Sequence, residues 1–201
     1  MKKLILPVCL LLAGVITAGA QGFSVGARIG LNIANQSLTA SGLSVSPSSK
    51  IGYLIGGYAK IMFNDKMGIQ PELFLSSVGT KYPASLFGTE ATARLNYISI
   101  PVFFRYNITD NFHLLGGPQL GILASAKGIV SGQPDTDIKS DFSSSDFGAT
   151  LGAGVDFGPF NAGLRYNFSF SNIASDSGDF SGVTVKNNAI QLVAGYKLFG
   201  K

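Results

Sequence analysis

The sequence predicts an all-β protein, an eight-stranded antiparallel up-and-down β-barrel that spans a membrane. Hydrophobic residues make up 46% of the chain and charged residues only 13%, against roughly 25% charged in a typical globular domain. Apolar and polar residues alternate with a period of two in eight segments, as half-buried strands do. The connections between these segments are alternately short and long. Together these observations favour a barrel embedded in lipid.

The first residues, MKKLILPVCLLLAGVITAGAQG, have a positive start, an apolar stretch and an A-x-A site, as secretory signal peptides do. We expect a signal peptide over residues 1–20, cleaved after Ala20, and one barrel domain over 21–201. The apolar stretch is shorter than the about 20 residues that span a bilayer as a helix. Cys9, the only cysteine, lies within it, so we expect a mature chain without disulfides or thiol chemistry.

Each predicted strand carries apolar side chains on one face and small polar ones on the other. In 160–172, for example, Phe160, Leu164 and Tyr166 alternate with Asn161, Gly163 and Arg165. The eight predicted strands are 23–33, 50–63, 67–77, 95–106, 112–124, 146–157, 160–172 and 188–199. Each is at least as long as the about 9–11 residues that cross a bilayer as a tilted strand.

The connections differ in length and composition. Short turns are predicted at 63–67, 107–111 and 157–160, and long Ser/Gly-rich loops at 35–49, 78–92, 126–145 and 173–187. Barrels of the outer membrane have short periplasmic turns and long extracellular loops. We therefore expect a location in the bacterial outer membrane, with both mature termini in the periplasm and the long loops outside.

The alternation alone also fits a soluble secreted barrel of the lipocalin type, in which the apolar face points inward. The polar face is mostly Gly, Ser, Asn and Thr, whereas a water-facing exterior is about 25–35% charged. Aromatic residues also lie near the strand ends, as in the girdles at membrane interfaces. They are Phe23, Phe63, Tyr106, Phe112, Phe157, Phe160 and Phe170. We predict that the apolar face meets lipid, and keep the soluble binding barrel as an alternative.

Three prolines, Pro71, Pro101 and Pro118, lie inside predicted strands. Proline has no N–H to donate to a neighbouring strand. Pairing Tyr106 with Phe112 across the 107–111 turn places Pro101 opposite Gly117. We predict a local bulge or bend at that level.

Seven charged residues fall on the inward face: Arg28, Lys60, Glu72, Arg105, Asp156, Arg165 and Lys197. Buried charges must be paired or remain hydrated. The sequence predicts a structural ion-pair network in the lumen, with Glu72 accepting from Arg105 or Arg28. An eight-stranded barrel leaves no room for a wide channel, because side chains fill it.

The residues for enzymatic chemistry are missing from the sequence. His113 is the only histidine, and no GxSxG or HExxH motif occurs,. We expect no catalytic residue, no metal site and no cofactor. The net charge of +4 includes lysines of the predicted signal peptide, so it predicts no nucleic-acid partner.

Four segments match a known pattern: GIQPELFLSSVGTKY (68–82), LNYISIPVFFRY (95–106), LLGGPQLGILAS (114–125) and FGATLGAGVDF (147–157). Together they resemble the PorT-like outer-membrane β-barrel family of Bacteroidota. Ser99 stands where that family often has glutamate. The resemblance implies a barrel in the outer membrane. It also suggests a role in a secretion machinery, since the member that gives the family its name is linked to one.

The sequence therefore predicts a non-enzymatic barrel with a scaffold role, or an accessory role in an envelope or secretion complex. A narrow small-solute pore and a barrel that binds ligands through its surface loops are the alternatives. The expected partners are the lipid and lipopolysaccharide of the outer membrane and an envelope or secretion-complex protein. We expect the barrel to be monomeric.

Overall fold

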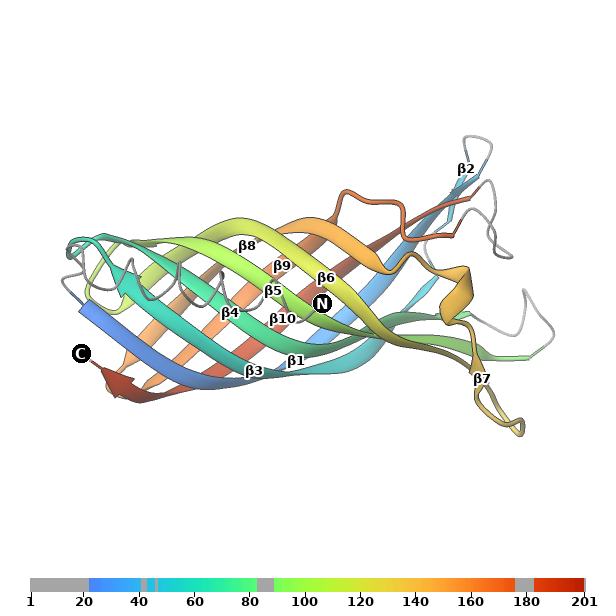
Figure 1. Cartoon of the computed structure of the whole chain (residues 1–201), viewed down its shortest axis with the longest axis horizontal. Helices are drawn as coiled ribbons and strands as arrows, with labels where there is room; N and C mark the ends of the chain where they lie inside the picture. Colours follow the sequence, from blue (N-terminus) through green and yellow to red (C-terminus); the bar gives the residue numbers. More distant parts are fainter. Residues whose placement is uncertain (1–21, 41–42, 46, 83–88, 176–182, 201) are drawn as a thin grey trace, which may run out of the picture.

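Eight long antiparallel strands close into a barrel in the computed structural model, which describes residues 22–40, 43–45, 47–82, 89–175 and 183–200 (Figure 1). Neighbouring strands in the chain are neighbours in the sheet, and β10 pairs with β1 to complete the ring. The predicted up-and-down topology is confirmed. The predicted signal peptide (1–20) lies outside the described residues. No helix among the described residues is long and apolar enough to cross a membrane.

Seven of the eight strands run past the predicted ends on the long-loop side, whereas β9 ends at Ser169, before the predicted end at residue 172. The ring consists of β1 (Gly22–Ala40), β3 (Ser48–Met62), β4 (Met67–Tyr82), β5 (Ala91–Asn107), β6 (Phe112–Val130), β8 (Ser145–Phe157), β9 (Phe160–Ser169) and β10 (Thr184–Gly200). Short β2 (Leu43–Val45) pairs with β1, and β7 (Thr136–Asp137) pairs with β6. A single 3-10 turn, η1 (Lys139–Asp141), follows β7. Much of what we expected to be loop is therefore strand.

The three short turns lie at one end of the barrel, at the left in Figure 1, and polar side chains close them. The Asn64 Oδ1 atom accepts from the N–H groups of Lys66 (2.9 Å) and Met67 (2.8 Å). Gly158 has a φ of 62°, a left-handed conformation that glycine adopts without steric cost. The turns thus form where Asn, Asp, Gly and Pro occur in the sequence.

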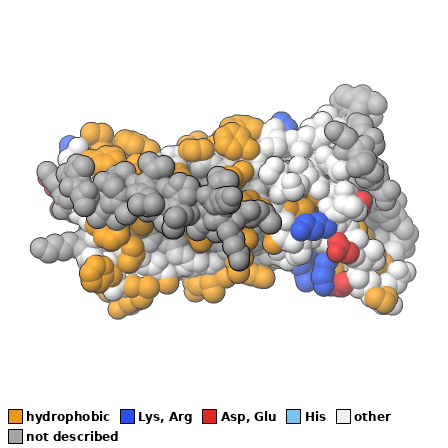
Figure 2. Space-filling view, in the orientation of Figure 1, with side chains coloured by type: hydrophobic (Ala, Val, Ile, Leu, Met, Phe, Trp, Pro, Cys, Tyr) orange, Lys and Arg blue, Asp and Glu red, His pale blue; other side chains and the backbone are white. Residues whose placement is uncertain are grey.

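Large apolar side chains cover the outer wall, as predicted. We call the exposed set on the outward positions the apolar band; it includes Ile29, Leu31, Ile51, Tyr53, Leu73, Leu75, Ile98, Phe104, Ile122, Leu151, Leu164, Tyr166, Ile190 and Leu192. Figure 2 shows hydrophobic side chains along much of the barrel and the main group of charged ones beyond them at the long-loop end. This arrangement matches a wall that faces lipid and excludes the lipocalin-type interior.

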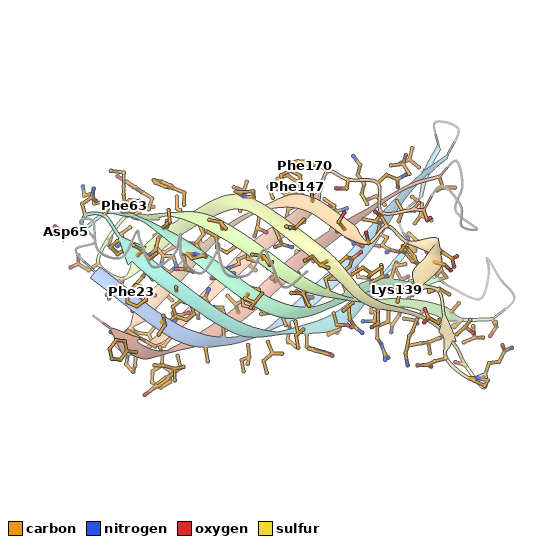
Figure 3. All side chains as sticks on the ribbon, in the orientation of Figure 1. Phe23, Phe63, Asp65, Lys139, Phe147 and Phe170 are labelled. Carbon is orange, nitrogen blue, oxygen red and sulfur yellow. The ribbon has the colours of Figure 1, made fainter. Side chains whose placement is uncertain are left out.

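Aromatic residues lie toward both ends of this wall (Figure 3). Phe23 and Phe63 lie near the short turns, and Phe147 and Phe170 lie further toward the long loops. The rings of Phe147 and Phe170 are neighbours, with centroids 6.1 Å apart. Rings at these positions suit the two interfaces of a bilayer.

The prolines interrupt strand pairing without a bulge, so part of our prediction is wrong. Tyr106 pairs with Leu114 and Pro101 with Gln119, because the turn is displaced by one residue along the chain. Phe112, the first residue of β6, closes the turn, since its N–H donates to Thr109 Oγ1 at 3.0 Å.

Pairing of β5 with β6 stops at Pro101 and resumes at Phe104 opposite Gly116, in the same register. Pairing of β4 with β5 likewise stops at Pro71 and resumes at Phe74. The missing proline donors leave gaps in the ladder, and the strands keep their alignment across them.

Beyond the apolar band the barrel continues, and its polarity reverses. We call this part the outer extension; it comprises the strand ends on the long-loop side, together with β2, β7 and η1. Its interior is a cluster of apolar side chains, the outer core: Ala34, Val78, Ala93, Leu95, Tyr97, Leu123, Ala126, Phe142, Ile173, Ala174, Val185 and Ala189. Phe142 and Ile173 come from segments predicted as loops, and their segments pair with each other through Phe142 and Ala174. The long-loop end of the barrel is therefore filled by a packed core.

Candidate functional site: the lumenal charge network

Glu72, on β4, is at the centre of the charged lumen. Its carboxylate accepts from Arg28 on β1 and from both terminal nitrogens of Arg165 on β9, at 2.7 and 2.9 Å. Gln70 Nε2 donates to the same carboxylate at 2.6 Å. The Glu72 side chain is 0% exposed. Three side chains thus supply the donors that a fully buried carboxylate needs.

Two aromatic rings and an amide complete the surroundings of the arginines. The Arg28 guanidinium lies over the ring of Tyr58, 4.4 Å from its centroid, and that of Arg165 lies over Phe103 at 4.8 Å. Arg28 also donates to Asn161 Oδ1 at 2.6 Å, and Asn161 donates to the Tyr58 hydroxyl at 2.9 Å. Ring faces attract cations most strongly where water is excluded. The network therefore links β1, β3, β4, β5 and β9 across the lumen.

A second carboxylate, Asp156 on β8, lies nearer the short turns. Arg105 Nη2 donates to Asp156 Oδ2 at 2.5 Å, and Lys60 Nζ is 3.7 Å from the same oxygen. The Nδ1 atom of His113 lies 4.0 Å from the other oxygen. The Asp156 side chain is 23% exposed. This cluster is consequently the wetter end of the network.

Gln70 connects the two carboxylates. Its amide nitrogen donates to Glu72, and its amide oxygen accepts from Arg105 Nη1 at 3.2 Å. Arg105 also donates to Asn107 Oδ1 at 2.9 Å. Six charged residues and their neutral neighbours thus form a continuous polar chain in the part of the lumen nearer the short turns.

The structure brings six of the seven predicted residues into this network. Glu72 pairs with Arg28, one of the two partners we expected. Arg105 pairs with Asp156, because it lies opposite Gly68 in the sheet, four residues along β4 from Glu72. Lys197 is half-buried near the short turns, and no carboxylate in the described part of the chain lies within salt-bridge distance of it.

Sequence reasoning missed the neutral members of the network. Gln70, Tyr58 and Asn161 lie at inward-facing positions in the alternation of their strands. This alternation was the signal that could have identified them. It also missed Asp146, whose Oδ2 atom accepts from Ser169 (2.8 Å) and Asn187 (2.9 Å) below the outer core. An inward-facing position in the alternation shows that a side chain enters the lumen. It does not show which strand on the other side of the lumen carries its partner.

This arrangement is suited to fixing the walls of the barrel. The buried charges are held by partners on other strands, so movement of one wall would leave charges unpaired at a high cost in free energy. No group of three or more metal-ligating side chains is found among the described residues. A closed ring with an apolar outer wall and a filled lumen defines a transmembrane β-barrel of the eight-stranded class.

Comparison with known proteins agrees with that class. The family model described as "Outer membrane protein beta-barrel domain" matches residues 19–175. The chain therefore belongs to this family of outer-membrane β-barrels, and its location is the bacterial outer membrane. A search of the curated proteins finds no match.

Several solved structures of outer-membrane proteins align with most of this chain. Neisserial surface protein A has a TM-score of 0.51 and 18% identity, over 90% of this chain and 99% of that one. Ail of Yersinia pestis, solved with the heparin analogue sucrose octasulfate, has a TM-score of 0.46 and 20% identity, over 88% and 99%. OprG from Pseudomonas aeruginosa has 0.46 and 14%, over 91% and 99%. At 18% identity, the likeness to neisserial surface protein A is one of fold.

Proposed function

We propose that this chain is a closed, non-enzymatic scaffold barrel of the outer membrane that serves an envelope or secretion complex. The observation that carries the proposal is the filled lumen. The Glu72 network blocks the part within the membrane, and the outer core blocks the part on the long-loop side. A barrel obstructed at two levels is suited to holding surfaces in place more than to moving solutes. The PorT-like segments in β4, β5, β6 and β8 support an accessory role of this kind.

In this proposal the mature protein is residues 21–201 and the barrel is a monomer in lipid and lipopolysaccharide. The outer extension holds the long loops at a fixed distance from the membrane, because its strands and outer core form one packed unit. The outer extension would present the long loops to a protein partner outside the cell. The short turns would present a second surface in the periplasm.

A direct test is crosslinking of the tagged protein in native outer membranes, followed by purification in mild detergent. The proposal expects one or two envelope proteins in stoichiometric amounts. Loss of those proteins when the exposed residues 131–137, which lie outside the outer core, are replaced by a Gly/Ser linker would locate the contact. Recovery of the barrel alone would contradict the accessory role.

A narrow pore is the second candidate, and the lumenal charge favours it. The six charged residues of the network are four cations and two anions, which gives 4 − 2 = +2. A pore through this lumen would prefer anions. Planar-bilayer recording distinguishes the candidates: the scaffold gives no stable conductance, and the pore gives an anion-selective conductance that changes in Glu72→Gln.

A further inference from the structure

Three basic side chains meet on the outer wall just beyond the apolar band. Lys50, Lys81 and Arg94 belong to β3, β4 and β5, and they line one pocket of about 370 Å³. Thr92, Ile51 and Ile129 line it as well. With Ser49, the pocket thus combines three cations, two hydroxyl groups and two apolar side chains.

The sheet is built to leave this pocket open. Pairing of β3 with β4 is interrupted between Ser49 and Leu54, and Lys50 lies in the interruption. Gly79, which pairs with Arg94, has a φ of 138° and has no side chain to cover the wall there. A Cβ atom at Gly79 would lie 2.0 Å from the Ala93 carbonyl oxygen. The local backbone therefore requires glycine beside the cations.

The three cations lack acidic partners in the described part of the chain. No described carboxylate lies within salt-bridge distance of Lys50, Lys81 or Arg94, although Glu90 is exposed nearby in the chain. Lys50 is only 7% exposed, and its ammonium is 3.5 Å from Ser77 Oγ. The like charges of Lys50, Lys81 and Arg94, which line the same pocket, repel one another,. An anion in the pocket would relieve this repulsion.

The position of the pocket identifies the kind of anion. Ile51, which lines it, is 71% exposed and belongs to the apolar band that faces lipid. A ligand with its charge among the cations would have its apolar part against this band. Phosphate groups take charge-assisted hydrogen bonds from Arg and Lys, and membrane lipids join phosphate to acyl chains.

We propose that Lys50, Lys81 and Arg94 form a binding site for the phosphate headgroup of an outer-leaflet lipid. The site lies outside the lumen and is independent of the scaffold role. It would fix one lipid beside β3–β5 and help to set the depth of the barrel in the membrane.

The test is native mass spectrometry of the folded mature protein in detergent micelles doped with phosphatidic acid or with phosphatidylcholine. We expect retention of phosphatidic acid in preference to phosphatidylcholine, weakened by salt because Coulomb attraction is screened. The exposed double variant K81Q/R94Q should weaken retention by about tenfold or more. Anomalous gel mobility before heating would verify that this variant is folded.

Two lysines serve as matched controls. Lys127 is on the same end but already lies 3.6 Å from Asp135, and Lys66 is exposed in a short turn at the opposite end. K127Q and K66Q should retain phosphatidic acid as the wild type does. Equal retention by K81Q/R94Q and the wild type would overturn the proposal. Displacement of the lipid by equimolar inorganic phosphate would also overturn it, since the site would then select free phosphate.

Discussion

The membrane-spanning part and the outer extension are built from the same eight strands with opposite polarity. In the membrane-spanning part, apolar side chains face outward and Arg28, Glu72 and Arg165 face inward. In the outer extension, Leu95 and Val185 face inward, while Arg94 and Lys127 are exposed. On β5 the change occurs within a few residues, between outward Ile98 and outward Arg94.

The solvent around each part explains the reversal. Lipid requires an apolar exterior, so polar groups in that region can only be placed inside, where they must satisfy one another. Water outside the membrane allows a polar exterior, and burial of apolar side chains then stabilises the interior as in a soluble protein. One strand can serve both environments because its faces alternate continuously and only the polarity of the side chains changes.

The largest predicted effect is in the lumen of the membrane-spanning part. Glu72→Gln removes the charge that holds Arg28 and Arg165, and leaves two buried guanidinium groups without a counter-ion. We expect the free energy of unfolding to fall by about 3–5 kcal/mol, measured by urea unfolding from lipid vesicles. Glu90→Gln, an exposed carboxylate, is the matched control and should have little effect. Equal stabilities of the two variants would contradict the network as described.

The outer core should respond as the interior of a soluble protein does. Leu95→Ala leaves a cavity among packed side chains, and we expect it to cost about 3 kcal/mol. Leu75→Ala, on the lipid-facing wall, should cost less, because acyl chains can fill the space that the side chain leaves. The same urea measurement compares them. A larger loss in Leu75→Ala would show that the outer extension is not packed as a core.

The wetter end of the network should be less sensitive than the Glu72 end. Asp156→Asn removes the partner of Arg105 and Lys60, but water can reach this carboxylate. We expect a loss of about 1–2 kcal/mol in the free energy of unfolding, distinctly below that of Glu72→Gln. If the order of the two variants were reversed, the burial assigned to the two carboxylates would be wrong.

The smallest effect is expected at the surface of the outer extension. Lys127 and Asp135 form an exposed ion pair 3.6 Å long, and such pairs contribute about 0–1 kcal/mol. Lys127→Gln should change the midpoint of urea unfolding very little, and added salt should abolish the difference. A loss comparable to that of Asp156→Asn would indicate that this pair is shielded from water.

The sequence predicts the membrane-spanning part well because two independent signals agree there. The alternation places Phe104 outside and Arg105 inside, and turn residues such as those at 107–111 separate the strands. The outer extension was missed because its alternation continues with reversed polarity: Ala93, Leu95 and Tyr97 are apolar on the inward face. The apolar outer face therefore stops at Ile98, and that change resembles the end of a strand.

The charge network was predictable as a set of residues and less so as a set of pairs. The alternation of inward and outward positions along each strand is enough to place Glu72, Arg165 and Asp156 in the lumen. Which of them meet depends on strand tilt and on the register of distant strands, such as β4 and β9, and neither is encoded in local sequence. The register of β5 and β6 was mispredicted by two residues because the turn between them is centred one residue later than expected, with Tyr106 opposite Leu114.

The reversal of polarity can be tested most directly with single cysteines, since Cys9 is the only natural one and is absent from a chain that starts at residue 21. The three sites are on β6: Ile122→Cys in the apolar band, Ala126→Cys in the outer core and Lys127→Cys on the outer surface of the extension. The protein is folded in lipid vesicles and treated with a membrane-impermeant maleimide. Labelling after unfolding in urea verifies that all three thiols are reactive. Our account predicts rapid labelling of Lys127→Cys and protection of the other two. Rapid labelling of Ile122→Cys would contradict a lipid-facing band, and rapid labelling of Ala126→Cys would contradict a packed outer core.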